Sequence, residues 1–233
     1  MKLRRKPQLN QTPTAGDYLT KVLPKGDVFN QEHRYKFVII VGGPGMGKST
    51  LLLSQFIQPS TLPVLIFATK PQKWMEHLKG IESEQLKHWE LALRQASNKG
   101  SVPVIRGYDS EANPEYFMEN LIALADGRGL NCTVILEDCT NYVQFKASQR
   151  FQRLVNQREH FRCNVIMTYH SLQSVPRELF QYADFLILFK TGSSRKHLKS
   201  LDKIPNAETV LAAFDTVEAH PNKHFYVPLN FQR

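Results

Sequence analysis

Short apolar runs alternate with longer, more polar stretches along most of this chain. Each run has the length of a β-strand, and its unbroken apolar character is typical of a strand buried on both faces of a sheet. We therefore expect strands over Phe37–Val41, Val64–Thr69, Val102–Arg106, Thr133–Glu137, Cys163–Thr168, Asp184–Lys190 and Phe225–Leu229. Pro228 cannot donate a ladder hydrogen bond, so the last strand is expected at an edge of the sheet.

The stretches between these runs have helical spacing. Helices are expected over Ser49–Gln58, 73–97, Glu115–Ala125, Val143–His160, Pro176–Tyr182, Arg195–Lys203 and Glu208–Val217. Pro114 suits the first turn of the third helix, because its missing N–H would have no partner there. Buried strands that alternate with helices predict an α/β fold: a mainly parallel central sheet in a three-layer α/β/α arrangement.

Residues 1–30 differ from the rest of the chain in pattern and charge. They contain several prolines and glycines, show no lasting periodicity, and carry six Lys or Arg against two Asp. A flexible basic arm is expected there, followed by a single domain over residues 31–233. The apolar runs are far too short to cross a bilayer, and none follows the basic N-terminus, so neither a transmembrane helix nor a secretory signal is expected.

Composition narrows the class of protein only modestly. The 233 residues include 30 Lys+Arg and 21 Asp+Glu, a net charge of +9, and 42% are hydrophobic, which excludes wholesale disorder. The positive charge suits an anionic partner such as nucleic acid, but it equally suits a soluble basic protein. The three cysteines lack metal-binding spacing, so a reducing compartment is expected, with neither a disulfide framework nor a zinc site.

The strongest chemical signal lies directly after the first strand. The sequence GGPGMGKST matches the Walker A phosphate loop, GxxxxGK[ST], between a predicted strand and a predicted helix. Such a loop points backbone N–H groups at a phosphate, and the helix that follows adds the positive end of its dipole. The predicted nucleotide contacts are Gly42, Gly43, Pro44, Gly45, Met46, Gly47, Lys48, Ser49 and Thr50. Lys48 is expected at the β- and γ-phosphates of ATP, and the Ser49 hydroxyl at Mg²⁺.

Two adjacent acids end the strand at Thr133–Glu137. Glu137 is expected to face Mg²⁺, and Asp138 to orient and polarise the attacking water. Such acids at the end of a buried strand are costly unless a cation or water is nearby. A strand that ends in solvent with ordinary acids is the less favoured alternative.

The strand at 163–168 also ends in polar residues. His170, or alternatively Thr168, is predicted to sense the γ-phosphate. The polar helix between these strands and its flank carry several arginines, and a ring NTPase needs one supplied by a neighbouring subunit. Arg158 is predicted first for this role, followed by Arg150 and Arg162, although a solvated helix face also explains such a run.

The order of four blocks, GGPGMGKST, VILEDC, NVIMTYHSLQSVPREL and ADFLILFKTG, resembles the HerA–FtsK group of DNA-pumping ATPases. Within that group the chain looks like the genome-packaging ATPases of tailless double-stranded DNA viruses with an internal membrane. The resemblance covers about residues 36–230, and the block at 163–190 distinguishes this group from other P-loop proteins. It implies a RecA/FtsK-like fold with an additional strand between the Walker A and Walker B strands. The chain departs from the group at Glu137, usually Asp, and at His170, commonly Gln.

The resemblance also implies partners and a location. It implies a homo-oligomeric ring, hexameric or pentameric, with ATP sites between subunits and double-stranded DNA gripped without sequence specificity. The candidate DNA-backbone contacts are Lys70, Lys73, Arg195, Lys196, Lys199 and Lys203. A capsid vertex or portal, and internal membrane proteins, are further implied partners. The implied location is the virion vertex and the host cytoplasm.

Two other functions stay open on the sequence. GGPGxGK also opens nucleoside-monophosphate kinases, although the paired acids favour water as the nucleophile and the 73–97 stretch lacks an arginine-rich clamp. A P-loop protein that binds ATP and acts through assembly or export partners is the other alternative.

Overall fold

The computed structural model describes residues 35–74, 76–80, 106–109, 114–126, 129–141 and 149–231. These residues form an eight-stranded sheet with the order β3-β4-β2-β5-β6-β1-β7-β8. Only β8 runs antiparallel within this described sheet. The strands are β1 (Phe37–Val41), β2 (Val64–Phe67), β3 (Lys79–Gly80), β4 (Arg106–Asp109), β5 (Cys132–Leu136), β6 (Cys163–Tyr169), β7 (Phe185–Phe189) and β8 (Tyr226–Asn230).

Helical segments connect the strands. The α-helices are α2 (Lys48–Leu51), α4 (Pro114–Ala125), α5 (Gln149–Asn156) and α6 (Ala207–Ala219), and α2 continues as a π-helix over Leu52–Ile57. Shorter 3₁₀ segments lie at Pro71–Lys73, Cys139–Asn141, Leu172–Ser174, Arg177–Gln181 and Arg195–Lys203. No helix of the described residues is both long enough and apolar enough to cross a membrane.

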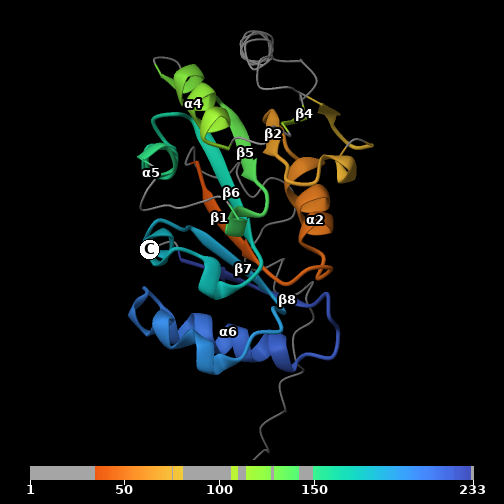
Figure 1. Ribbon diagram of the computed structural model, residues 1–233, viewed down its shortest axis with the longest axis vertical. Helices are drawn as coiled ribbons and strands as arrows, with labels where there is room; N and C mark the ends of the chain where they lie inside the picture. The colour runs from red at the N-terminus through yellow and green to blue at the C-terminus, as the bar shows by residue number, and fades with distance from the viewer. Residues whose placement is uncertain are drawn as a thin grey trace, which may run out of the picture.

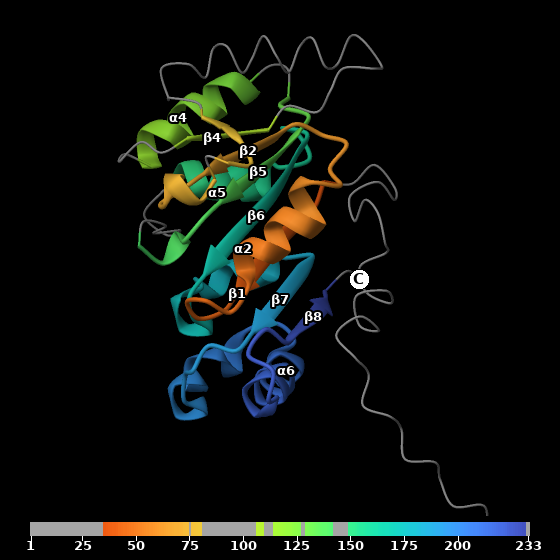
Figure 2. The same cartoon turned by 90° about the vertical axis from the view of Figure 1, so that its right-hand side faces the viewer.

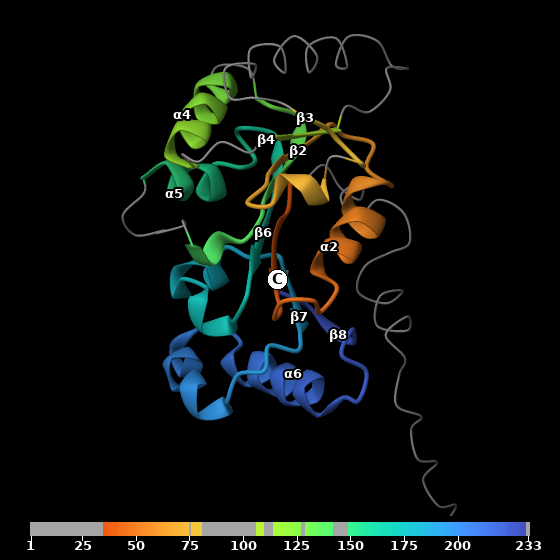
Figure 3. The ribbon, with the colours of Figure 1, turned by 45° about the vertical axis from the view of Figure 1, so that its right-hand side comes forward.

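Helices cover both faces of the sheet and give the predicted three layers (Figure 1). Strand β1 shows how the sequence builds them, because its alternate side chains enter different cores. Phe37, Ile39 and Val41 pack into a core with α4, α5 and α6. Val38 and Ile40 pack into a second core with α2 and the π-helix. Turning the molecule shows α2 on one face of the sheet and α4 and α5 on the other (Figures 2 and 3).

The topology confirms the expected additional strand. β6 pairs with β1 on one side and β5 on the other, so it separates the strand before the phosphate loop from the strand with the paired acids. Pro228 lies in the antiparallel edge strand β8, as its missing N–H requires.

Several predicted elements differ from the structure in extent. The stretch predicted as helical from residue 73 starts at the last residue of the 3₁₀ turn Pro71–Lys73 and holds the short strand β3 before residue 81, because β3 pairs with β4 at the sheet edge. Of the strand predicted at 102–106, the structure describes only Arg106, which opens β4 and pairs with β2; β4 continues beyond the predicted end to Asp109. Among the described residues, helix α5 ends at Asn156, four residues before the end of the helix predicted over 143–160. Residues 1–30, 81–105 and 142–148 lie outside the described residues, so the predicted arm is untested there.

Candidate nucleotide site

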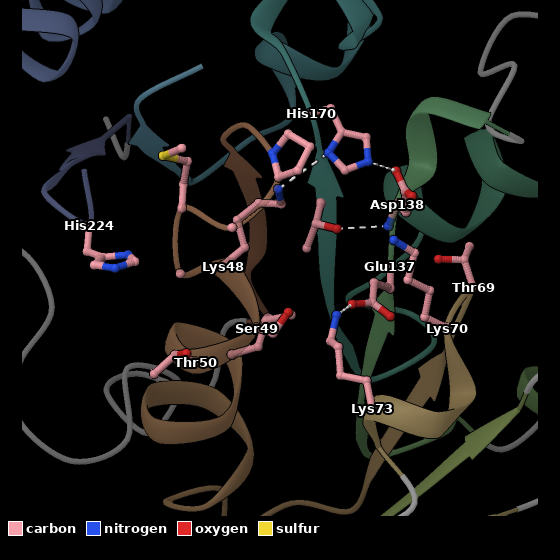
Figure 4. Close-up of a pocket in the computed structure, with 16 residues that line it drawn as sticks. Lys48, Ser49, Thr50, Thr69, Lys70, Lys73, Glu137, Asp138, His170 and His224 are labelled. Atoms are coloured by element: carbon pink, nitrogen blue, oxygen red, sulfur yellow. Dashed lines mark hydrogen bonds and ion pairs between the residues drawn. The ribbon is translucent and has the colours of Figure 1, made fainter. Parts of the chain in front are cut away.

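The phosphate loop leaves β1 at the carboxyl edge of the parallel sheet. The Gly42 N–H donates to the Tyr169 carbonyl at 3.0 Å, and the Gly43 N–H donates to the Lys190 carbonyl at 2.9 Å, so the loop is anchored to the ends of β6 and β7. Gly45 and Gly47 have φ angles of 72° and 102°, in the left-handed region that favours glycine. The loop residues Pro44–Thr50 line a pocket of about 420 Å³, together with residues at or just after the ends of β2, β5 and β6 (Figure 4).

Lys48 lies at the centre of this pocket (Figure 4). Its ammonium donates to the Gly42 carbonyl and, at 3.1 Å, to the Gly43 carbonyl, and it lies 3.5 Å from His170 Nδ1. Burial lowers the pKa of the Lys48 ammonium to about 8, and the nearby Asp138 carboxylate opposes this shift. The ammonium is thus held by its own loop and is only partly solvated. An incoming phosphate would stabilise its charged form by placing anionic oxygens beside it.

The two predicted acids both line the pocket but have different surroundings. Glu137 is 6% exposed. The Trp74 indole N–H donates to Glu137 Oε2 at 2.8 Å, and the Lys73 ammonium contacts Oε1. Lys73 therefore faces the pocket, whereas the sequence placed it among candidate DNA contacts. Its neighbour Lys70 lines the same pocket.

Asp138 turns away from Glu137 and toward β6. Its φ of 59° lies in the left-handed region, which Asp tolerates better than most residues. The Asp138 N–H donates to the buried Thr168 hydroxyl at 2.8 Å. Asp138 Oδ1 lies 2.7 Å from His170 Nε2. Thr168 thus positions the turn that holds Asp138, and His170 is the β6 side chain that reaches the acid.

The structure therefore forms a continuous line of contacts across three strand ends. Lys48 follows β1, His170 follows β6 and Asp138 follows β5, with His170 between the other two (Figure 4). The His170 N–H donates to the Thr140 hydroxyl at 3.2 Å, which fixes the backbone of this residue. The structure thus brings these three predicted site residues together at one edge of the sheet.

The donor set suits a hard divalent cation. The Ser49 hydroxyl and the Glu137 carboxylate line the same pocket, and both offer oxygen. Mg²⁺ prefers oxygen ligands and takes few from the protein, keeping waters and substrate phosphates for the rest. Ser49 and Glu137 fit the predicted metal position, provided that the Lys73 ammonium gives way or a water bridges the gap.

Arg158, predicted first for action on a neighbour's ATP, makes several contacts within its own chain. Its side chain is 15% exposed, and one terminal nitrogen lies 3.2 Å from Asp184 Oδ2. The guanidinium also donates to the Tyr35 carbonyl at 3.2 Å and to the Val155 carbonyl at 3.0 Å. Asp184 in turn accepts the Phe37 N–H at 2.7 Å. Arg158 thus ties together the amino ends of β1 and β7 within its own chain.

The other arginine candidates lie on exposed surface. Arg150 contacts Glu115 at 3.2 Å and Glu119 at 3.4 Å, and Arg162 is exposed just before β6. Among the other candidate DNA contacts, Arg195 contacts Asp215, and Lys196 and Lys203 are exposed. Residue Lys199 lies in the 3₁₀ segment Arg195–Lys203, and its side chain is outside the described set.

Two supports of the site had no signal in the sequence. His224 lines the phosphate pocket although it belongs to the turn before β8 (Figure 4). Glu218 of α6 anchors the loop after β7: its Oε1 accepts the Thr191 N–H at 2.7 Å, the Thr191 hydroxyl at 2.8 Å and the Gly192 N–H at 3.0 Å. Both residues are distant in sequence from the phosphate loop, so only the folded chain brings them there.

The fold is that of a P-loop NTPase: a strand leads through the phosphate loop into a helix, and β6 lies in the sheet between that strand and the strand that ends in the paired acids. Solved structures agree. The genome-packaging NTPase B204 from Sulfolobus turreted icosahedral virus 2, in complex with AMP, superposes with a TM-score of 0.64 at 14% identity, covering 84% of this chain and 92% of that chain. Its complex with ATP-γ-S gives 0.63 at 13% identity, with coverages of 84% and 92%.

A third structure is that of B204, the DNA-packaging ATPase from Sulfolobus turreted icosahedral virus. It superposes with a TM-score of 0.62 at 15% identity, covering 84% of this chain and 92% of that chain. No protein-family model matches the sequence, and no curated protein matches it either. At these identities the similarity concerns the fold.

Proposed function

We propose that this chain is an ATP-hydrolysing motor that moves double-stranded DNA into a preformed viral capsid. The observation that carries the proposal is the line Lys48–His170–Asp138, which joins the phosphate loop to an acid across three neighbouring strand ends. A phosphate-binding lysine and a water-activating acid within reach of one polar sensor are the parts that nucleoside triphosphate hydrolysis needs. The shared fold with a genome-packaging NTPase supports the DNA-packaging part.

Each side chain has a defined task in hydrolysis. Lys48 and the loop N–H groups bind the β- and γ-phosphates of ATP, and this contact restores the full charge of the partly desolvated ammonium. Mg²⁺, held at Ser49 and Glu137, would neutralise phosphate charge as it develops. Asp138 orients and polarises the attacking water. His170 touches both Lys48 and Asp138, so it links occupancy of the γ-phosphate position to the acid.

A second hollow beside the phosphate pocket suits the base of the nucleotide. It measures about 310 Å³ and shares Gly47, Thr50 and His224 with the phosphate pocket. Phe189 and Tyr226 supply aromatic surface there, with ring centroids 4.8 Å apart. Burial raises the pKa of Tyr226 to about 12, so its hydroxyl stays a neutral hydrogen-bond donor.

The assembled motor is proposed to be a ring, hexameric or pentameric, at the virion vertex or in the host cytoplasm. Its partners would be a capsid vertex or portal and internal membrane proteins. The exposed residues Arg150 and Arg162 replace Arg158 as candidates for the arginine that acts on a neighbour's ATP. Exposed Lys196 and Lys203 are candidates for sequence-independent contacts with DNA phosphates.

The decisive test measures ATP hydrolysis by the full chain with and without double-stranded DNA of unrelated sequences. Hydrolysis should rise with any such DNA. Asp138→Asn should retain nucleotide binding and lose turnover by about 10²-fold or more, because the attacking water loses its base. Glu159→Gln, which removes an exposed carboxylate far from the pocket, is the matched control and should behave as wild type.

Three results would refute the proposal in different ways. Transfer of phosphate from ATP to a nucleoside monophosphate would establish the kinase alternative. ATP binding without hydrolysis at any DNA concentration would favour an assembly or export role. Equal turnover in Asp138→Asn and wild type would remove Asp138 from the mechanism.

A further inference from the structure

Trp74 and Lys73 both contact the Glu137 carboxylate, but they differ greatly in burial. Trp74 is 1% exposed, so its indole, which donates to Oε2 at 2.8 Å, is fixed in the core. The Lys73 side chain is 35% exposed, and its ammonium reaches Oε1 from the pocket side (Figure 4). That ammonium also lies 4.9 Å from the centroid of the Trp74 ring. One partner is therefore structural, whereas the other can leave toward solvent.

The backbone at this point is held independently of Lys73. The Glu137 N–H donates to the Phe67 carbonyl at 3.0 Å, continuing the pairing of β5 with β2. A change in the partner of the carboxylate therefore moves the lysine side chain and leaves the strand end in place. Because a buried carboxylate is costly without a cation, some positive charge must remain beside it in every state.

We propose that Lys73 is a positioning residue that neutralises Glu137 before a divalent cation binds, and that the cation and the Lys73 ammonium compete for this carboxylate. The inference rests on the proposed function, because the competing cation is the one that accompanies the nucleotide. When the cation enters, the ammonium leaves both Glu137 and the face of Trp74. Before the cation binds, Lys73 thus balances the negative charge of Glu137 and holds its carboxylate in place. The strength of this contact sets the Mg²⁺ concentration that is needed to fill the site.

Trp74 supplies a readout that does not depend on activity. The chain has two tryptophans, so Trp89→Phe leaves Trp74 as the only indole. In this background the full chain starts metal-free in EDTA, and the concentration of free Mg²⁺ is then raised stepwise. The titration is done at saturating ATP-γ-S and again without nucleotide. Trp74 emission should change as the ammonium leaves its ring.

Lys73→Met keeps the aliphatic stem and removes the competing charge. Its half-saturating Mg²⁺ concentration should be lower by on the order of tenfold, the size expected for one charge-assisted hydrogen bond. The part of the emission change caused by the departing ammonium should be lost. Lys73→Arg keeps the charge and should restore competition. Arg177→Met, which removes one positive charge from an exposed residue that is not among those lining the pocket, is the matched control and should leave the half-saturation point within about twofold, because a distant exposed charge is largely screened.

Two outcomes would overturn the proposal. One is the same half-saturation point and emission change in Lys73→Met as in its parent. The other is weaker binding of ATP-γ-S by Lys73→Met in EDTA, which would make Lys73 a phosphate ligand. If the parent itself bound no nucleotide, the proposed function would fail, and the titration without nucleotide would still decide whether Mg²⁺ and Lys73 compete.

Discussion

Raising the pH from 7.5 to 9.5 should weaken phosphate binding through one group, Lys48. Burial holds its pKa at about 8 in the free protein, so its charge is lost within this range. A bound phosphate places anionic oxygens beside the ammonium and raises its pKa again. Binding above pH 8 therefore requires uptake of a proton, and affinity falls as pH rises. Below pH 8 the lysine is already charged, and the affinity should level off.

The expected size follows from the fraction of charged lysine. With a pKa of about 8, roughly three-quarters of Lys48 is charged at pH 7.5 and roughly one-thirtieth at pH 9.5. The dissociation constant should therefore rise about twentyfold, provided that Lys48 stays charged in the complex. The assay is competition of ADP against a fluorescent nucleotide in EDTA, so that no metal-bound group titrates.

Two variants test the physical cause. Lys48→Arg carries a permanent charge and should give a flat profile over the same range, whatever its absolute affinity. Asp138→Asn removes the charge that opposes desolvation, so the midpoint should move to lower pH. A flat wild-type profile, or a midpoint near the ordinary lysine value, would refute the assignment of Lys48 as a desolvated phosphate ligand.

Three substitutions probe the frame around the site by denaturant unfolding. Gly42→Ala places a Cβ 2.6 Å from the Phe189 Cβ, so it should destabilise the fold by about 1–3 kcal/mol; an unchanged midpoint would show that the loop can shift freely. Thr168→Val leaves the Asp138 N–H without its acceptor and should cost about 1–3 kcal/mol and slow hydrolysis, whereas Thr168→Ser should retain both. Arg158→Met should cost about 2 kcal/mol, between surface and buried ion pairs, with normal turnover in the folded enzyme; lost turnover at wild-type stability would restore its predicted role in a neighbour's site.

Local pattern was sufficient for the centre of the fold and for the phosphate loop. The fully buried residues of β1 and β7 read directly as strands, because both faces of each strand are covered. The loop was predictable because its spacing and glycines are required by backbone geometry. The order of strands was not in the pattern itself: the position of β6 between β1 and β5 came from the resemblance, and the structure confirms it.

The contacts of single side chains could not be predicted where their partners lie far away in the sequence. Arg158 looked like a free arginine on a polar helix, but its partner Asp184 follows 26 residues later. Lys73 was a candidate DNA contact on the sequence, yet it contacts Glu137, which lies 64 residues away. Neither partner is marked by spacing, because these contacts depend on which strands become neighbours. The residues that end adjacent strands, such as His170, were predictable because parallel strand ends meet at one edge.

A few hydrogen bonds connect helix α6 to the phosphate loop through the residues that follow β7. One oxygen of Glu218 gathers three donors from Thr191 and Gly192, and the preceding Lys190 carbonyl accepts the Gly43 N–H. These hydrogen bonds lie one after another between α6 and the phosphate loop. A load applied to α6 therefore has a stiff path to the backbone that grips phosphate. A displacement of α6 would therefore be transmitted to the nucleotide site through the Glu218 carboxylate.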